Sequence, residues 1–270
     1  MNNTNMGFKN KLFPFPFKGD RIKDIHLNGD DEPFFGFVIF PYQTKEQLDE
    51  TMSLFIKTYM LKCHDKFDAI SLHQIMAKDT DEKPVIQYLQ VENKGKRVKR
   101  FAFWSIKVVV PTLEDVIDWN GRAQEIYAEQ GTYGSNGLKK PDGENHIKYV
   151  LEEIRNSIHF GEDNLPTISK KAAYLWQRIC AQQSFNNGNK RTAMLAMLIF
   201  LHANGYEFQY KKGLKHELVE LSLRIATSLS SDRSNRKIDI DEIEAYILSH
   251  VRLNLTNDPW NTLELMQSEE

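Results

Sequence analysis

The residues best suited to chemistry form one short polar stretch, residues 183–192 (QSFNNGNKRT), which runs into the apolar segment 193–201. A glycine-containing turn at the start of a buried helix presents unpaired backbone N–H groups and the positive end of the helix dipole. Such a helix start is suited to binding an anion, and phosphate is the usual one. Lys190 and Arg191 add two cations at the same place, so the stretch predicts a phosphate site. The alternative is a capped, solvated basic turn that binds no ligand.

Helices must position this stretch, because strand patterns end near Pro111 and helical spacing of apolar residues takes over. Between the first two expected helices lies a turn-rich segment, residues 131–143 (GTYGSNGLKKPDG), which is either a functional loop or a linker. Asp239 is a suitable N-cap for the last helix. The helices that we expect cover residues 112–130, 146–157, 167–180, 189–203, 215–228 and 239–253.

The first 110 residues predict a small α/β module of unknown role. Thr44 is the expected N-cap of its first helix, with Gln47 at the capping-box position. Strand patterns cover residues 34–42, 85–91 and 98–110, and helical spacing covers residues 44–62 and 68–77. The last two strands form a hairpin, whose basic tip indicates either a nucleic-acid contact or a solvated edge. The basic residues of this tip are Lys94, Lys96, Arg97, Lys99 and Arg100.

Composition and charge narrow the classes of protein to consider. The 270 residues are enough for one large or two small domains, and an apolar content of 41% allows a packed core. The formal net charge is −2, which gives no indication of binding to nucleic acid or to a membrane surface. Residues 1–20 contain phenylalanines interrupted by prolines and lysines, unlike a signal peptide. Cys63 and Cys180 lie far apart, so we expect two reduced thiols in a cytoplasmic protein.

The polar stretch resembles the signature of the Fic/Doc (death-on-curing) family, His-x-Phe-x-(Asp/Glu/Asn)-(Gly/Ala)-Asn-(Gly/Lys)-Arg. The Thr-Ala that follows and the later Asn204-Gly205-Tyr206 are similar to the Doc-like variant, and Met194 stands where other members have a second arginine. The resemblance covers residues 111–251, roughly half of the chain. The residues that match the signature in place are Phe185, Asn187, Gly188, Asn189, Lys190 and Arg191.

The sequence patterns and the resemblance together give a fold class and a domain organisation. The class is α+β: the patterns of residues 1–110 predict a small N-terminal α/β module, and the resemblance implies an all-helical Fic/Doc-like (Fido) domain over residues 111–253. A polar tail over residues 254–270 would follow. The family also implies that the loop around residues 133–140 is a flap that docks the target segment.

The activity that the resemblance implies is a toxin-type transfer of AMP or phosphate from ATP to a hydroxyl of a target protein. In this interpretation Gly188 lets the backbone approach the phosphates, and Asn189 with the neighbouring N–H groups holds phosphate oxygens. Arg191 offers a bidentate fork and Lys190 a point charge. Asn187 stands where the family helps bind Mg²⁺, and it can ligate only through a neutral carbonyl. The implied cofactors are therefore ATP and Mg²⁺.

Gln183 is the one departure from the signature, because the family has histidine at this position. That imidazole takes the proton from the target hydroxyl, whereas an amide has no titration near neutral pH. A glutamine can still orient a nucleophile through hydrogen bonds. His146, His159 and His202 are the candidates for a replacement base. The predicted catalytic residues are Gln183, Asn189, Lys190 and Arg191.

Three interpretations of Gln183 stay open from the sequence. The first is an active transferase that takes its base from elsewhere or needs little base assistance. The second is a degenerate domain that binds a nucleotide or a partner without chemistry, as a regulatory interaction module. The third is an engineered, inactivating substitution in an otherwise ordinary toxin. Expected partners are a protein substrate with a Ser, Thr or Tyr hydroxyl and an antitoxin or an intramolecular restraint. We expect no membrane and no nucleic-acid partner.

Overall fold

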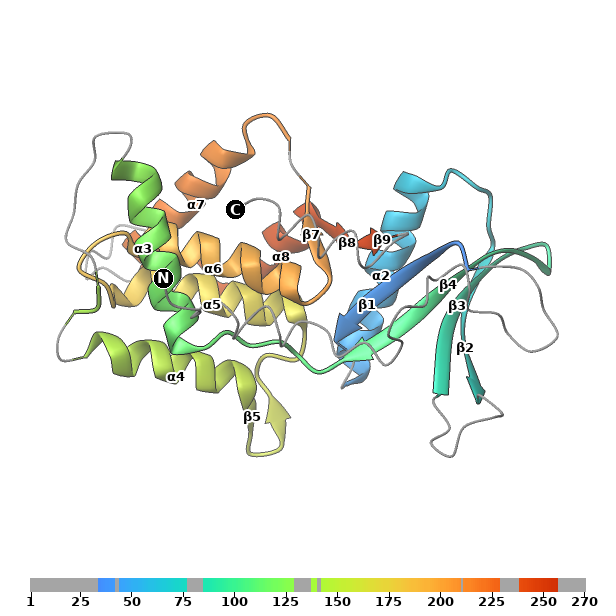
Figure 1. Ribbon diagram of the computed structural model, residues 1–270, viewed down its shortest axis with the longest axis horizontal. Helices are drawn as coiled ribbons and strands as arrows, with labels where there is room; N and C mark the ends of the chain where they lie inside the picture. Colours follow the sequence, from blue (N-terminus) through green and yellow to red (C-terminus); the bar gives the residue numbers. More distant parts are fainter. Residues whose placement is uncertain are drawn as a thin grey trace, which may run out of the picture.

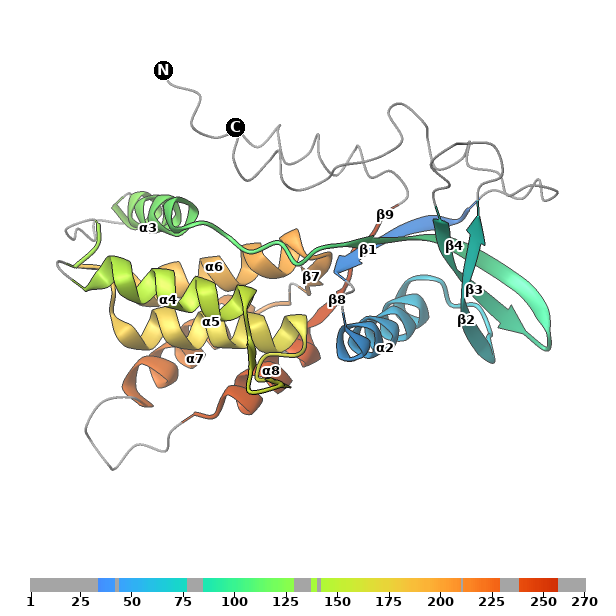
Figure 2. The same cartoon turned by 90° about the horizontal axis from the view of Figure 1, so that it is seen from below.

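The computed structural model describes residues 34–41, 44–76, 85–128, 137–139, 142–209, 211–228 and 238–256. Two parts lie side by side along the long axis: a β-sheet with one helix against it, and a group of helices (Figures 1 and 2). The predicted α+β class is confirmed. Among the described residues, no helix is both long and apolar enough to cross a membrane.

The sheet has five strands in the order β2-β3-β4-β1-β9, and only the β1–β4 pair is parallel. Helix α2 (Lys45–Lys62) covers one face (Figure 2), and the rings of Phe55 and Tyr59 pack edge-on against Phe101 at centroid distances of 5.1 and 5.8 Å. Thr44 caps α2 as predicted, since its hydroxyl accepts the Gln47 N–H at 3.3 Å. The strands are β1 (Gly36–Pro41), β2 (Ala69–Met76), β3 (Val85–Asn93), β4 (Lys96–Ile106) and β9 (Leu255–Thr256).

The helix predicted over residues 68–77 is wrong, because this segment is strand β2. Its apolar residues Ile70 and Leu72 stand opposite Val91 and Leu89 of β3, with a spacing of two residues on both strands. A segment this short fits both periods, and pairing with a distant strand decided between them.

Six helices of the described chain form the second part, with α5 and α6 at its centre. Trp176 of α5 and Phe200 of α6 are fully buried, and the other helices pack around this pair (Figure 1). The turn after α6 is at Asn204 and Gly205 as predicted. The helices are α3 (Leu113–Ala128), α4 (Gly143–Arg155), α5 (Ile168–Gln182), α6 (Asn189–Ala203), α7 (Leu214–Ser228) and α8 (Ile240–His250).

Short strands also occur after Pro111, where we expected helices only. β5 (Ile158–His159) pairs with β6 (Glu162–Asp163), and β7 (Tyr206–Phe208) pairs with β8 (Val251–Leu253). The helix predicted over residues 239–253 is therefore too long. Its end became β8 because Val251 and Leu253, two residues apart, both have buried side chains against the core.

Helix α2 joins the two parts through two charged side chains. The Glu50 carboxylate accepts the backbone N–H of Ser169 at 3.2 Å, at the start of α5, and the hydroxyl of Tyr206 at 2.7 Å. At the other junction, the Lys57 ammonium donates to three backbone carbonyls at the end of α8, those of Leu248, Ser249 and Val251, at 3.0, 3.3 and 2.9 Å. An anion at a helix start and a cation at a helix end both complement the helix dipole.

Candidate functional site

The polar stretch forms a tight loop between the two central helices. Helix α5 ends at Gln183, which adopts the left-handed conformation with φ 49° and ψ 48°. Two residues later the side chain of Phe185 is fully buried and fixes the loop in the core. Gly188, with φ 76°, is the N-cap of α6. The loop therefore reverses the chain so that the start of α6 lies beside the end of α5.

Asn189 holds the shape of this loop with its side chain. Its Oδ1 accepts the backbone N–H of Phe185 at 2.8 Å, and its Nδ2 donates to the carbonyl of the same residue at 2.9 Å. The first backbone bond of α6 runs from the Thr192 N–H to the Gly188 carbonyl at 2.8 Å. By helix geometry, the N–H groups of Asn189 and Lys190 precede this bond and have no intrahelical acceptor. Asn189 thus has a structural role in addition to the predicted contact with phosphate.

Two amides of helix α3 hold the other side of the loop. Asn120 Nδ2 donates to the Asn187 carbonyl at 3.0 Å and to the Thr192 hydroxyl at 2.8 Å. Gln124 Oε1 accepts a hydrogen bond from the Arg191 guanidinium at 2.9 Å. A Cβ atom on Gly188 would lie 2.3 Å from Gln124 Nε2, so any other residue at this position would require the Gln124 side chain to move. The sequence analysis missed both amides, although their spacing of four residues, after Val116, places them in the buried stripe of α3.

The described end of the turn-rich segment also contacts the loop. The Lys139 N–H donates to the Ser184 carbonyl at 2.8 Å, and the Asn186 N–H donates to the Gly137 carbonyl at 3.0 Å. These bonds form an isolated antiparallel bridge between Leu138 and Phe185. The rest of the predicted flap lies outside the described residues.

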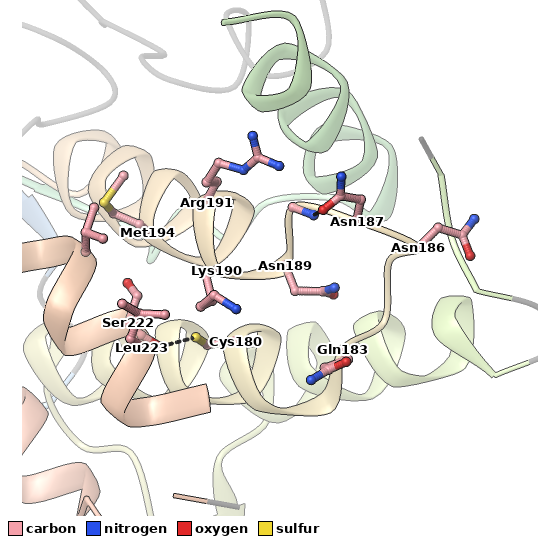
Figure 3. Close-up of a pocket in the computed structure, with 12 residues that line it drawn as sticks. Cys180, Gln183, Asn186, Asn187, Asn189, Lys190, Arg191, Met194, Ser222 and Leu223 are labelled. Carbon is pink, nitrogen blue, oxygen red and sulfur yellow. Dashed lines mark hydrogen bonds between the residues drawn. The ribbon is translucent and has the colours of Figure 1, made fainter. Parts of the chain in front are cut away.

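A pocket of about 390 Å³ opens where the loop, the start of α6, the end of α5 and the middle of α7 meet (Figure 3). All six residues from 186 to 191 line it. Figure 3 shows Lys190 and Asn189 between Gln183 at one end and Cys180, Ser222 and Leu223 at the other. The described lining residues are Cys180, Gln183, Asn186, Asn187, Gly188, Asn189, Lys190, Arg191, Met194, Val219, Ser222 and Leu223.

The charged side chains in the described lining of this pocket are cationic. They are Lys190 and Arg191, and the described lining contains neither a carboxylate nor a histidine. Burial raises the pKa of the Cys180 thiol to about 12, and the thiol donates to the Ser222 carbonyl at 3.0 Å. Cys180 is therefore protonated at neutral pH and is no base. The arrangement is suited to holding an anion at the start of α6.

The predicted replacement bases lie elsewhere. His159 lies on the β5–β6 hairpin, with its Nε2 2.7 Å from the Glu153 carboxylate. His202 lies at the far end of α6, where burial lowers its pKa. His146 is an exposed residue of α4. None of the three is among the described lining residues of the pocket.

Part of the basic hairpin tip is structural. Lys99 pairs with the Asp65 carboxylate and lies 4.2 Å above the ring of Phe35. Arg100 is 3% exposed, with its guanidinium 5.3 Å from the ring of Phe34. These two cations stabilise the module, which disfavours the nucleic-acid interpretation of the tip.

The donor set of the pocket fits phosphate better than Mg²⁺. Magnesium prefers carboxylate and phosphate oxygens. Asn187 Oδ1, the predicted ligand, accepts the Gly188 N–H at 2.7 Å, and no carboxylate is among the described lining residues. Within the described residues there is also no group of three or more His, Cys, Asp or Glu side chains suited to a metal ion. The protein residues alone therefore do not make a Mg²⁺ site.

Comparison with known proteins agrees with this geometry. The sequence profile of the Fic/DOC family matches residues 110–201, which include α3 to α5, the whole loop and α6 except for its last two residues. Over 86 residues the chain is 31% identical to a protein named Toxin Doc from Mycolicibacterium smegmatis. That alignment covers 32% of this chain and 59% of the toxin. Residues 110–201 of this chain are therefore similar to the Fic/DOC family.

Proposed function

We propose that the helical part binds a nucleoside triphosphate by its phosphates and transfers a phosphate-containing group to a hydroxyl of a target protein. The observation that carries this proposal is the pocket itself, which gathers all six residues from 186 to 191, two of them cationic, at the start of α6. In the transfer, a bond forms between the hydroxyl oxygen and a phosphorus atom. The bond from that phosphorus to its leaving group breaks, and the hydroxyl proton passes to solvent or to the leaving group.

The residues of the loop would divide this work. The N–H groups at the start of α6 and the Lys190 ammonium would hold phosphate oxygens, and Arg191 would stabilise negative charge that develops in the transition state. Asn120, Gln124 and the Asn189 side chain keep these groups in place through the hydrogen bonds described above. Phosphoryl-type transfer depends mainly on such positioning and charge stabilisation.

Gln183 would position the target hydroxyl rather than deprotonate it. It is exposed, lies at one end of the pocket, and has its backbone fixed by the end of α5. Loss of a general base typically lowers a rate by on the order of 10²–10⁴-fold. We therefore propose a slow transferase of the toxin type, whose target carries a Ser, Thr or Tyr hydroxyl.

A second candidate function is nucleotide-dependent binding without transfer. The lack of a base in the described pocket lining favours it. In this case the pocket would hold a nucleotide or a partner, and the chain would act as a regulatory interaction module. An antitoxin is a candidate partner. An intramolecular restraint by the N-terminal module has less support, because no residue between 34 and 106 is among the described lining residues.

One labelling experiment separates the two candidates. The protein, Gln183→His and Arg191→Ala are incubated in a cell lysate with ATP labelled at the α- or the γ-phosphate. Protein label from α-labelled ATP indicates AMP transfer, and label from γ-labelled ATP alone indicates phosphate transfer. Transfer predicts weak label with the natural chain, stronger label with Gln183→His and none with Arg191→Ala. If only Gln183→His gives label, transfer by the natural chain is rejected and binding alone remains.

A further inference from the structure

The β5–β6 hairpin carries an aromatic residue at a position that disfavours one. Phe160 and Gly161 connect its two strands, and both have a positive φ, of 53° and 87°. A two-residue turn of this kind prefers Asn, Asp or Gly, because most side chains are strained in the left-handed region. The ring of Phe160 is also fully exposed. Phe160 therefore destabilises the isolated chain in two ways, which indicates a role outside its own fold.

The hairpin presents this ring to the outside of the molecule. Figure 1 shows the hairpin projecting from the helices between the end of α4 and the start of α5. Ile158, two residues before Phe160, is 65% exposed. Glu162, two residues after it, is exposed as well and forms no ion pair with a described residue. The projecting element therefore combines two apolar side chains with a carboxylate.

A groove of about 610 Å³ lies at the base of the same hairpin, between α4, α5 and the start of α8. We name it the α5–α8 groove. Asn164 and Leu165 of its lining directly follow β6, and the Glu153 carboxylate of its lining is 2.7 Å from His159 of β5. Its lining also includes Tyr149, Tyr174, Arg178 and Ile240. Hairpin and groove are therefore neighbours on one face of the chain.

The walls of the α5–α8 groove suit an aromatic ring. The Arg178 guanidinium lies 5.1 Å from the centroid of the Tyr174 ring, which is itself buried. The ring of Tyr149 is 60% exposed. An incoming phenyl ring would thus meet a guanidinium and an open tyrosine ring, and both contacts are favourable for an aromatic side chain.

Arg178 also suits the carboxylate of the hairpin. Its Nε is buried without a hydrogen-bond partner, and its guanidinium forms no ion pair with a described carboxylate. A carboxylate that arrives beside the phenyl ring would supply the missing counter-charge. Glu162 stands two residues after Phe160, so one hairpin carries both groups.

The carboxylates in the described lining of the groove are engaged within the chain. Glu153 lies against His159, as noted above. Asp239 is the N-cap of α8, and its side chain accepts the Asp241 N–H at 3.4 Å. The cation of Arg178 is therefore left for a group from outside.

The closeness of hairpin and groove favours a second copy of this chain as the partner. Two copies related by a two-fold axis can each place their hairpin in the groove of the other, because such an interface uses the same surface twice. This exchange is closed, so assembly ends at the dimer. The groove accepts an aromatic ring and a carboxylate, and the hairpin of an identical chain offers both.

We propose that this chain forms a two-fold symmetric dimer through the β5–β6 hairpin. Phe160 of each copy packs against Tyr149 and Arg178 in the α5–α8 groove of the other copy, and Glu162 pairs with Arg178. One hairpin and one groove on each side make a small interface, so we expect a dissociation constant in the micromolar range. The groove shares no described lining residue with the pocket at the start of α6, so the dimer and the proposed transfer are tested separately.

The test is the molar mass of the full chain in solution, measured by sedimentation over a range of micromolar concentrations. The natural chain is expected to change from monomer to dimer as concentration rises, and Phe160→Gly is expected to stay a monomer. At a low concentration, where both are monomers, Phe160→Gly should melt at a higher temperature, because glycine adopts the left-handed backbone without strain. Met60→Ala removes a 60% exposed side chain from α2 and is the control, which should dimerise like the natural chain.

Charge reversal tests the pairing of the two copies. Glu162→Arg and Arg178→Glu should each weaken dimerisation by about tenfold, because each places like charges together. The chain with both substitutions restores opposite charges across the interface and should recover most of the loss. A double variant that dimerises no better than the single ones rejects the contact between Glu162 and Arg178.

Three results would overturn the dimer. A dimer that Phe160→Gly leaves intact is formed by another surface. A natural chain that is monomeric at every concentration rejects a second copy as the partner, and a lower melting temperature of Phe160→Gly would then assign the groove to the hairpin of the same chain. A monomeric natural chain with a higher melting temperature for Phe160→Gly would leave the hairpin to a different protein.

Discussion

The side chain of Asn189 pairs with both backbone groups of Phe185, accepting the N–H at 2.8 Å and donating to the carbonyl at 2.9 Å. One amide thus closes the loop in the way that a backbone pair closes a turn. Phe185 is fully buried, so its peptide groups have no access to water as an alternative partner. The geometry of the anion site therefore depends on this pair.

Asn189→Ala is expected to lower the free energy of unfolding by about 1–3 kcal/mol, because it leaves a buried N–H and a buried carbonyl without partners. Binding of tripolyphosphate should weaken as well, since the loop loses its fixed shape. Denaturant unfolding and calorimetric titration measure the two effects. Asn145→Ala, at an exposed position of α4, is the control and should change neither quantity. An unfolding free energy like that of the natural chain would contradict the structural role of Asn189.

Gly188→Ala tests the close approach between the loop and α3. A left-handed backbone costs an alanine about 1–2 kcal/mol, and its Cβ would also meet Gln124 Nε2 at 2.3 Å. We expect a larger loss of stability than for Gly95→Ala, where φ is also positive and nothing lies within 4 Å of the added Cβ. Thermal unfolding compares the two. Adding Gln124→Ala to Gly188→Ala should recover part of the difference, and no recovery would show that the contact is unimportant.

Gln124→Glu tests why a neutral amide holds Arg191. A carboxylate of nearly the same shape would pair with the guanidinium more strongly, so thermal stability should be kept or raised. It would also neutralise the charge that the site offers to an anion. Binding of tripolyphosphate should therefore weaken by about tenfold, as measured by calorimetry. Unchanged binding would mean that Arg191 does not face the bound anion. Gln124→Met separates loss of the hydrogen bond from the change of charge.

Glu50 gives a prediction for the pH dependence of stability. Burial is the main cause that raises the pKa of this carboxyl in the folded chain, and Glu244 nearby adds to it. The folded state therefore holds the proton to higher pH than the unfolded state, and stability falls as pH rises from about 4.5 through the raised pKa. In Glu50→Gln the free energy of unfolding should fall less over this pH range. At neutral pH this variant should therefore gain stability relative to the natural chain. Unfolding free energies across that range check it, with exposed Glu152→Gln as the control.

A fragment that begins at residue 111 tests whether the helical part is independent of the module. Such a fragment lacks Glu50 and Lys57, so Ser169, Tyr206 and the carbonyls at the end of α8 lose their partners. Each hydrogen bond to a charged group contributes about 1.5–3 kcal/mol, so the fragment should unfold at a clearly lower temperature. Residues 34–256 serve as the control. Equal melting temperatures would show that α2 is dispensable.

The sequence allowed much of the helical part and the first helix of the N-terminal module to be predicted, and the reasons are local. The cap at Thr44, the start of α6 after Gly188 and the stop at Asn204 depend on residues adjacent in the chain. What the sequence did not reveal depends on distant contacts. Pairing with β3 decides that β2 is a strand, and pairing with β7 decides β8. The roles of Asn120 and Gln124 depend on a loop 67 residues away in the sequence. The phosphate, metal and catalytic assignments remain predictions.

The pairing of β9 with β1 gives the sheet a particular order of assembly. Val38 of β1 pairs with Leu255 of β9, so the last strand of this sheet comes after the entire helical part in the sequence. During synthesis, β1 to β4 leave the ribosome first, and among the described strands none covers the second edge of β1 until the helices have been made. An uncovered edge is a place where chains pair with one another. Chains interrupted before residue 255 should therefore be lost to aggregation more often than chains interrupted after residue 256.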